Sequence, residues 1–373
     1  MEENSKYSSG MELAKAYYNE YGKEMIHTRF SEYEERIAVG LVGEGSDCFG
    51  YDDALSTDHD FGPNFCMWLS DEAYAEIGEE LQKEYEKLPI EFGGYKRVTT
   101  AMGQGRRGVL RISDFYKKYI GTDCYEEIDF SKVEDYALAV CTNGEVFRDD
   151  EGIFSSTRER LKTGYPEHIR LLKIAQDVAG FSQCGQYNYL RMLKREDKLT
   201  AGIMLSDFLK HAMKLYHHIL NVYPPHDKWL YESIKNLPDS ENVVFLLSQI
   251  SEKSMCTKNA EELQGIIESL AEYFAMKMYE LNDISDVDSY LDHHIGELLY
   301  KADISKLSDE ELVNQIAIIE FKAFDKVKNE GGRASCQNDW PTFSVMRKSQ
   351  YLTWSREMLI QYMFRRQVRL YPS

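Results

Sequence analysis

Apolar residues follow different patterns in the two halves of the chain. In the first half they form short continuous runs, such as 37–42 (Ile-Ala-Val-Gly-Leu-Val) and 65–69 (Phe-Cys-Met-Trp-Leu), which are bounded by polar segments. Runs of this length, rich in β-branched and aromatic residues, are typical of buried strands. The pattern then predicts a helix over 71–88 and a hairpin within 97–114. The first half is therefore expected to combine a few strands with helices.

Beyond about residue 160 the apolar positions recur every three or four residues, which is the spacing of amphipathic helices. Helices are predicted over 166–179, 200–220, 259–279 and 308–327. Ser308, followed three residues later by a glutamate, forms the capping-box pattern that begins a helix. Proline is scarce in the whole chain, at 8 of 373 residues. These features predict a large all-helical region.

The two patterns together predict an α+β protein in which a small sheet with helices precedes a helical bundle. We expect three domains, with residues 1–150 forming the sheet-containing domain, 151–300 a helical bundle and 301–373 a C-terminal helical domain. A chain of 373 residues is long enough for two or three domains with sizeable cores.

The segment between the two predicted strands carries the residues with the clearest chemistry. Gly45 and Ser46 follow the first apolar run, and Asp58 and Asp60 precede the second. Glycines allow a tight turn whose backbone N–H groups can face an anion. Side chains at positions i and i+2 of a strand share a face, so the two carboxylates are expected to lie side by side. Adjacent carboxylates repel unless a cation lies between them, and oxygen ligands suit Mg²⁺.

This arrangement resembles the nucleotidyltransferase superfamily that includes DNA polymerase β and the aminoglycoside nucleotidyltransferases. The matching residues are Gly45, Ser46, Asp58 and Asp60. The resemblance implies a small mixed sheet, a nucleoside triphosphate whose phosphates contact Ser46 and nearby amides, and Mg²⁺ held by Asp58 and Asp60. The longer segment 45–62 is closer still to a bacterial family of nucleotidyltransferase-like proteins of unknown function, over about residues 30 to 230.

Other interpretations of the same residues stay open at this point. Gly-Ser and Asp-x-Asp also occur in ordinary capped turns. The four aspartates 52, 53, 58 and 60 could suggest a calcium loop, but the segment lacks the alternating ligands and closing glutamate of an EF-hand.

The superfamily usually supplies a third carboxylate from a later strand. Asp114 is the nearest candidate and Glu91 the second, although Asp114 could equally cap the helix predicted at 115–119. Arg106 and Arg107 could contact a triphosphate, or could be solvated at the tip of the hairpin. A chain without a third carboxylate could have weak chemistry or none.

Charge and cysteine content narrow the class of protein. The formal charge of −19 argues against binding a nucleic-acid polymer and favours a neutral or cationic small substrate. Seven cysteines are scattered without Cys-x-x-Cys spacing, which is typical of reduced thiols in the cytoplasm. No apolar run approaches the roughly 20 residues that a membrane-spanning helix needs. A cytoplasmic protein is therefore expected.

The helical half offers weaker candidates. By the same resemblance, residues 151–300 would bind the acceptor, and Asp197 could accept a hydroxyl proton there, although an exposed helical charge is the plainer interpretation. His211 and His218 share a helix face and are expected to be partly buried bundle residues rather than metal ligands. The segment 324–354 resembles another bacterial domain of unknown function. It could form either a polar pocket or a packed helix–helix turn, with the pocket made by Arg333, Gln337, Arg347 and Gln350.

These observations predict a Mg²⁺-dependent nucleotidyltransferase that moves a nucleoside monophosphate from a triphosphate, with ATP the expected donor, to a hydroxyl group of a small molecule and releases pyrophosphate. Two alternatives remain. The chain could be a nucleotide-binding sensor that has lost turnover, because the third carboxylate is not evident, or an enzyme that nucleotidylates a protein.

Overall fold

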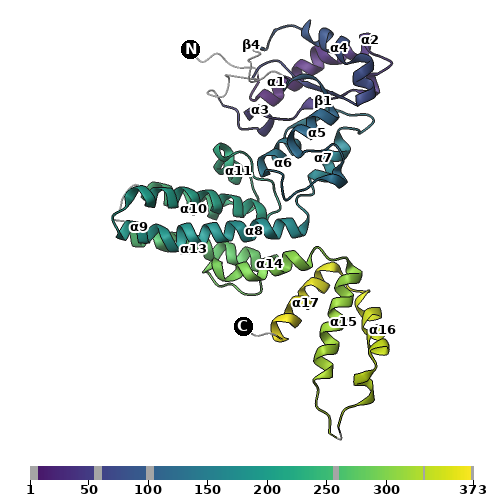
Figure 1. Cartoon of the computed structure of the whole chain (residues 1–373). Helices are drawn as coiled ribbons and strands as arrows, with labels where there is room; N and C mark the ends of the chain where they lie inside the picture. The colour runs from purple at the N-terminus through teal and green to yellow at the C-terminus, as the bar shows by residue number, and fades with distance from the viewer. Residues whose placement is uncertain (1–6, 54–60, 98–104, 255–259, 331, 371–373) are drawn as a thin grey trace. The chain divides into compact units, whose positions relative to one another are not determined.

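The computed structural model describes residues 7–53, 61–97, 105–254, 260–330 and 332–370. The chain forms two compact units, one comprising residues 1–165 and 222–233 and the other 166–221 and 234–373 (Figure 1). The expected α+β class is confirmed, because a small mixed sheet with helices makes up part of the first unit and the second unit is helical. The division into three domains stays a prediction.

The first unit contains α1 (Gly10–Tyr17), the π-helix η1 (Tyr18–Gly22), α2 (Lys23–Arg29), η2 (Glu34–Arg36), β1 (Ala38–Leu41), α3 (Ser46–Phe49), β2 (Cys66–Leu69), α4 (Asp71–Glu86), β3 (Glu91–Phe92), β4 (Tyr95–Lys96), β5 (Gly108–Arg111), α5 (Ile112–Ile120), η3 (Tyr125–Glu127), α6 (Asp135–Thr142), β6 (Glu145–Arg148), α7 (Ser155–Leu161) and η5 (Asp227–Trp229). Helix α11 (Leu230–Lys235) follows at the boundary between the units.

The main sheet of this unit has the strand order β5-β2-β1-β6. Strand β1 pairs antiparallel with both β2 and β6, and Val39 lies opposite Met67. Both predicted strands are confirmed, since every residue of β1 and β2 is buried. Successive residues of β2 face opposite sides of the sheet, as a strand requires. Met67 joins a core formed with α1, α2 and α4, whereas Trp68 stacks on Phe154 at a centroid distance of 4.0 Å.

The second strand of the hairpin predicted within residues 97–114 is confirmed as β5, whereas its predicted partner strand lies largely outside the described residues, so the hairpin itself stays a prediction. Strand β5 pairs parallel with β2, with Gly108 opposite Cys66. A parallel pair needs a crossover connection, and α4 supplies it. The hairpin that does form is the short pair β3 and β4, while residues 98–104 lie outside the described residues. The helix predicted over 71–88 is confirmed as α4.

The second unit contains α8 (Glu167–Phe181), the π-helix η4 (Ser182–Tyr189), α9 (Leu190–Lys194), α10 (Lys198–Ile219), α12 (Glu241–Ser254), α13 (Ala260–Glu280), η7 (Leu291–His294), α14 (Ile295–Ile304), α15 (Asp309–Asp325), η8 (Ser335–Asn338), α16 (Trp340–Tyr351) and α17 (Arg356–Leu370). The four helices predicted from apolar spacing are confirmed as α8, α10, α13 and α15.

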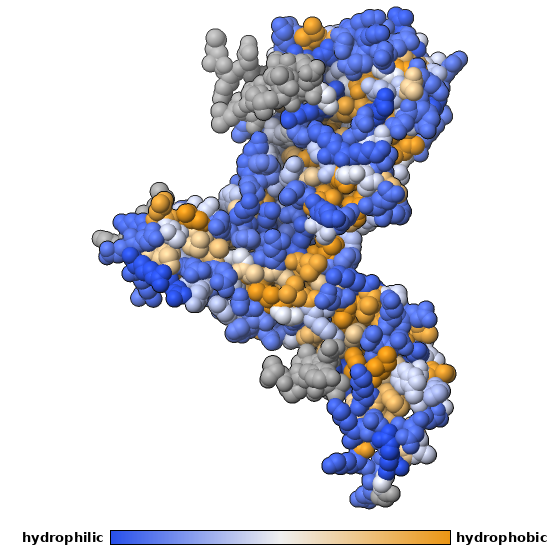
Figure 2. Space-filling model, in the orientation of Figure 1, coloured by the Kyte–Doolittle hydropathy of each residue, from blue (hydrophilic) through white to orange (hydrophobic). Residues whose placement is uncertain are grey.

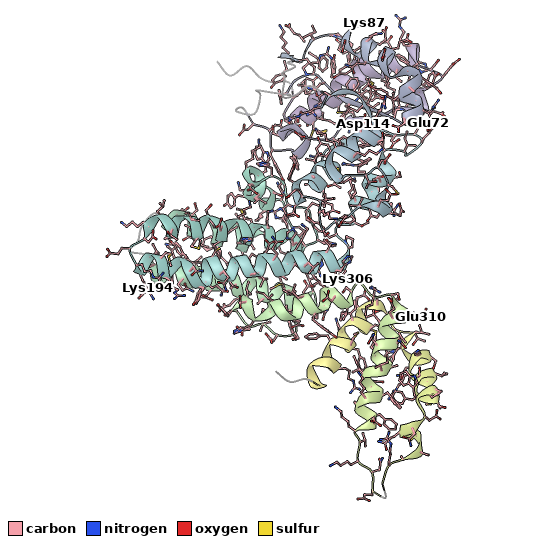
Figure 3. The ribbon with its side chains drawn as sticks, in the orientation of Figure 1. Glu72, Lys87, Asp114, Lys194, Lys306 and Glu310 are labelled. Carbon is pink, nitrogen blue, oxygen red and sulfur yellow. The ribbon has the colours of Figure 1, made fainter. Side chains whose placement is uncertain are left out.

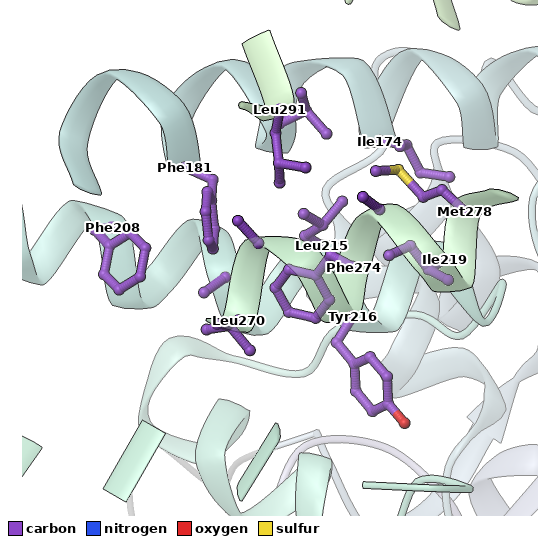
Figure 4. Packing of buried hydrophobic residues seen from close by; sticks show 14 of the residues in the cluster. Ile174, Phe181, Phe208, Leu215, Tyr216, Ile219, Leu270, Phe274, Met278 and Leu291 are labelled. Atoms are coloured by element: carbon purple, nitrogen blue, oxygen red, sulfur yellow. The ribbon is translucent and has the colours of Figure 1, made fainter. Parts of the chain in front are cut away.

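The bundle core forms where α8, α10 and α13 bring their apolar faces together (Figure 4). Phe181, Phe208 and Phe274 are fully buried in it, and the first two rings lie 4.7 Å apart. Two glycines let the chain of α8 and η4 approach α10 closely. A Cβ on Gly180 would lie 2.3 Å from the ring of His211, and a Cβ on Gly185 would lie 2.1 Å from the ring of Phe208.

The last three long helices form a separate small core around Ile316, Tyr351 and Leu359. Ser308 and Glu311 make the predicted capping box at the start of α15. Helix α15 ends at Asp325, two residues before the predicted end at 327. Among the described residues of this unit and the other, no helix combines the length and apolar character needed to cross a membrane.

The loop between α15 and α16 is organised by a buried glutamine. Gln337 is 1% exposed, and its amide nitrogen donates to the carbonyl oxygens of Phe324 and Val327 at 2.9 Å each. Its amide oxygen accepts from the backbone N–H of Ala334. Arg333 also bonds within the loop, to the carbonyl oxygen of Gln337. Of the two alternatives for this segment, the structure therefore supports a packed helix–helix turn.

Candidate functional site

The turn after β1 is built on two glycines that adopt the left-handed φ region. Gly43 has φ 135° and Gly45 has φ 131°, values that side chains other than hydrogen rarely allow. Asn143, which lies just before β6, holds Gly43 from both sides. Its side-chain oxygen accepts from the Gly43 N–H at 3.0 Å, and its nitrogen donates to the Gly43 carbonyl at 2.7 Å. The neighbouring strand therefore determines the position of this turn.

Gly45 also lies too close to its neighbours to carry a side chain. A Cβ there would lie 2.4 Å from Oδ1 of Asp47 and 3.0 Å from Nη2 of Arg107. Ser46 follows as the first residue of α3 and is half-buried. The Gly-Ser motif thus follows the buried central strand β1.

Arg107, which directly precedes β5, ties this turn to the segment that leads into β2. Its Nε donates to the side-chain oxygen of Asn64 at 3.0 Å, in the segment that leads into β2. Its Nη2 donates to Asp47 at 3.0 Å and to the carbonyl oxygen of Glu44 at 3.2 Å. The side chains of Arg107 and Asp47 are only 9% and 6% exposed. Arg107 is therefore a buried structural residue of the site, not a solvated residue at a hairpin tip.

Arg106 lies beside the same turn but closer to solvent. Its Nη2 pairs with Glu44 at 2.6 Å, and the two side chains are 25% and 28% exposed. The other oxygen of Glu44 accepts from Nζ of Lys118 at 3.0 Å and from the hydroxyl of Tyr119 at 2.8 Å. Burial alone would raise the pKa of Glu44, but these hydrogen bonds and the nearby positive charges outweigh it and lower that pKa below its ordinary value. Glu44 is thus an ionised group that gathers two cations next to Ser46.

The two carboxylates expected to bind metal, Asp58 and Asp60, lie outside the described residues. In the described ranges 7–53 and 61–97, and in the ranges that follow, no group of three His, Cys, Asp or Glu side chains could hold a metal ion. Cys48 and Cys66 are buried beside the turn, and burial raises the pKa of both thiols, so neither offers a soft thiolate.

The other acidic candidates lie at exposed or helix-capping positions. Asp114 lies in the first turn of α5, where its side chain is 75% exposed and pairs with Arg111 at 3.9 Å (Figure 3). It does not cap this helix, because the N-cap residue is Arg111. Asp197 is the N-cap of α10 in the second unit and accepts from the backbone N–H of Thr200 at 3.0 Å. Glu91 is exposed on the short strand β3.

The histidines predicted to be bundle residues flank one buried carboxylate. Nδ1 of His211 lies 2.9 Å from one oxygen of Asp177, and Nδ1 of His218 lies 2.6 Å from the other. Asp177 is buried, which alone would raise its pKa, but the two imidazoles lower that pKa below its ordinary value. This cluster joins α8 to α10.

Sequence reasoning missed the residues that hold the turn in place, namely Asn64, Asn143 and Glu44. Glu44 lies within the glycine motif, so its position offered a signal. The two asparagines lie at the ends of other strands, and the sequence contains no pattern that pairs them with the turn. On the face shown in Figure 2, hydrophilic residues predominate over the first unit, with apolar residues between them.

Comparisons with known proteins match only parts of the chain. The family described as Domain of unknown function (DUF4037) matches residues 130–230, which begin after the glycine turn. The family described as Protein of unknown function (DUF4125) matches residues 310–365, which include α16 and most of α15. No curated protein and no solved structure matches the chain.

Proposed function

We propose that this chain is a Mg²⁺-dependent nucleotidyltransferase, which transfers a nucleoside monophosphate from a nucleoside triphosphate to a hydroxyl group of a small molecule. ATP is the expected donor and pyrophosphate the second product. One observation carries the proposal: Gly45 and Ser46 occupy a tightly held turn at the end of buried β1, and the segment containing Asp58 and Asp60 leads into the adjacent strand β2. This order of turn, carboxylate pair and strand is the one on which the resemblance depends.

The proposal assigns distinct tasks to the residues of the turn. The hydroxyl of Ser46 and the neighbouring backbone N–H groups would bind the phosphates, and Asn143 and Arg107 keep that turn in one conformation. Asp58 and Asp60 would hold Mg²⁺, which supplies charge neutralisation at the transferred phosphate and the leaving pyrophosphate. Arg106 lies close enough to the turn to add positive charge. Positioning and charge neutralisation supply most of the catalysis in phosphoryl transfer.

The test is pyrophosphate release from each of the four nucleoside triphosphates with Mg²⁺ and a pool of hydroxylated small molecules. Asp58→Asn and Asp60→Asn should each reduce release by about 10³-fold, which corresponds to roughly 4 kcal/mol of barrier. Glu80→Gln is a matched control, because Glu80 is an exposed acid on α4 of the same unit. If wild-type protein releases pyrophosphate and the two aspartate variants keep that activity, the proposed metal site is wrong.

A second candidate is a nucleotide-binding sensor without turnover. The observation that favours it is the placement of Asp114, the foremost candidate for a third carboxylate, at an exposed position paired with Arg111. Mg²⁺-dependent nucleotide binding without pyrophosphate release, lost in Asp58→Asn, would select the sensor. If Asp114→Asn lowers release about 10²-fold or more, the sensor is excluded and Asp114 is catalytic.

We also propose a cytoplasmic location. All six cysteines in the described ranges are free thiols, as expected for a chain that stays in a reducing compartment.

A further inference from the structure

A cavity of about 530 Å³ lies within the second unit, where the ends of several helices meet. The first turns of α8 and α17, the end of α10, the residues that follow α13 and the end of α14 line it. Leu171, Leu220, Leu281 and Ile360 supply its apolar wall. Cavities of about 300–1,000 Å³ with an apolar wall and a few polar groups are typical of small-molecule sites.

The two buried cations of this cavity, Arg170 and Lys301, already have carboxylate and carbonyl partners. Arg170 donates to both oxygens of Glu167 and of Asp283 and to the carbonyl oxygen of Ile219, which uses all five N–H groups of a guanidinium. Lys301 donates to the carbonyl oxygens of Asn282 and Asp283 at 3.0 and 2.9 Å. Its Nζ also lies 2.7 Å from a carboxylate oxygen of Glu297. Arg170 therefore has no further hydrogen for an anionic ligand, and Lys301 already has three oxygens within 3.0 Å. The third cation of the lining, Arg356, pairs with Asp309 and donates to the carbonyl oxygens of Ser305 and Leu307.

Hydrogen-bond acceptors, by contrast, are in excess. Each carboxylate oxygen of Glu167 and Asp283 receives one hydrogen from Arg170, and such an oxygen can accept two. The cavity also includes the C-terminal ends of α10 and α13, which carry partial negative charge. Both helices end next to a residue in the left-handed region, Asn221 with φ 55° and Asn282 with φ 61°.

Two further polar groups in the cavity lining could accept a hydrogen bond from a ligand. The hydroxyl of Ser305 is buried and has no hydrogen-bond partner among the residues that the structure describes. Glu357 lies at the start of α17 and adds an exposed carboxylate to the lining. Burial raises the pKa of Asp283 above its ordinary value, even with Arg170 beside it, so a positively charged ligand would stabilise its ionised form.

We propose that this cavity binds a small organic cation, an amine carried on an apolar body. The ammonium group would donate to the spare acceptors of Glu167 and Asp283 and to the carbonyl ends of the helices. The apolar body would pack against Leu220 and Ile360. The formal charge of −19 favours the approach of a cation to this protein. This site is independent of the nucleotide site proposed above.

Three probes of one shape and different charge test the proposal on the full chain. Tyramine is a cation, 4-hydroxyphenylacetate is an anion, and 4-hydroxyphenylethanol is neutral. Saturation-transfer NMR at millimolar concentration should show tyramine binding at least about tenfold tighter than the anion, with the alcohol between them. Equal binding of the three probes, tighter binding of the anion, or no binding of tyramine would each overturn the proposal.

Two pairs of variants locate the binding. Ile360→Trp fills the cavity and should abolish the tyramine signal, whereas Met358→Trp, an exposed position on the same helix outside the lining, should keep it. Glu357→Gln should weaken tyramine binding about threefold to fivefold, and Glu310→Gln, an exposed acid of α15 (Figure 3), should not change it. Tyramine binding that survives Ile360→Trp places the amine elsewhere and refutes the assignment.

Discussion

Replacing Arg107 with leucine should strongly destabilise the first unit, whereas the same change at its neighbour Arg106 should not. Arg107→Leu leaves the carboxylate of Asp47 buried without its ion-pair partner, and loss of one partner of a buried pair costs about 3–5 kcal/mol. It also removes the donor to Asn64, worth roughly 1 kcal/mol. Arg106 and Glu44 are each about one-quarter exposed, so breaking their pair should cost about 1 kcal/mol or less.

Hydrogen exchange followed by mass spectrometry suits this test, because a protein with two compact units need not unfold in a single step. Peptides that contain β1 and β2 should lose at least about 3 kcal/mol of protection in Arg107→Leu relative to Arg106→Leu. Adding Asp47→Asn to Arg107→Leu should restore part of the loss, because the unpaired buried charge disappears. Equal exchange in the two arginine variants, or a further loss in the double variant, would refute the structural role assigned to Arg107.

Three further predictions concern the second unit. Gly185→Ala should lower the free energy of unfolding by about 1–3 kcal/mol, because its Cβ would collide with the ring of Phe208. Gly202→Ala, at an open position on α10, should raise that free energy by up to about 1 kcal/mol. Thermal unfolding compares the two variants. The folded-state pKa of Asp177 is lowered, so its ionised form stabilises the folded protein above its unfolded pKa of about 3.9, and this stabilisation is lost as pH falls through the folded-state pKa. In Asp177→Asn the free energy of unfolding should therefore depend less on pH between pH 5 and 2, as measured by denaturant unfolding at each pH. Gln337→Ala should open the loop it closes, seen as faster proteolysis there, with the remaining helices intact.

The strands and long helices were predictable from the sequence because their signal is local. The run around Val39 is continuous and apolar, as a strand buried on both faces must be, and the capping box at Ser308 needs only four consecutive residues. The parallel pairing of β5 was not predictable in the same way. Whether Gly108 pairs with Cys66 or with a neighbouring hairpin strand depends on where α4 directs the chain, which no local pattern specifies.

In the candidate site, too, the residues with a local signal were predictable from the sequence, and the residues that depend on distant partners were not. Gly45 and Ser46 could be recognised because a tight turn after a strand demands glycine, and the structure adds the reason: Asp47 and Arg107 leave no room for a Cβ. The partnership of Arg107 with Asp47 joins residues 60 positions apart and exists only once β5 lies beside β2. Because an arginine that braces a turn and an arginine that binds phosphate look identical in sequence, only their burial and partners separate the two roles. On those grounds Arg106, which is one-quarter exposed and paired with an ionised Glu44, is the better candidate for a phosphate contact, and Arg107 is the residue that holds the turn in place.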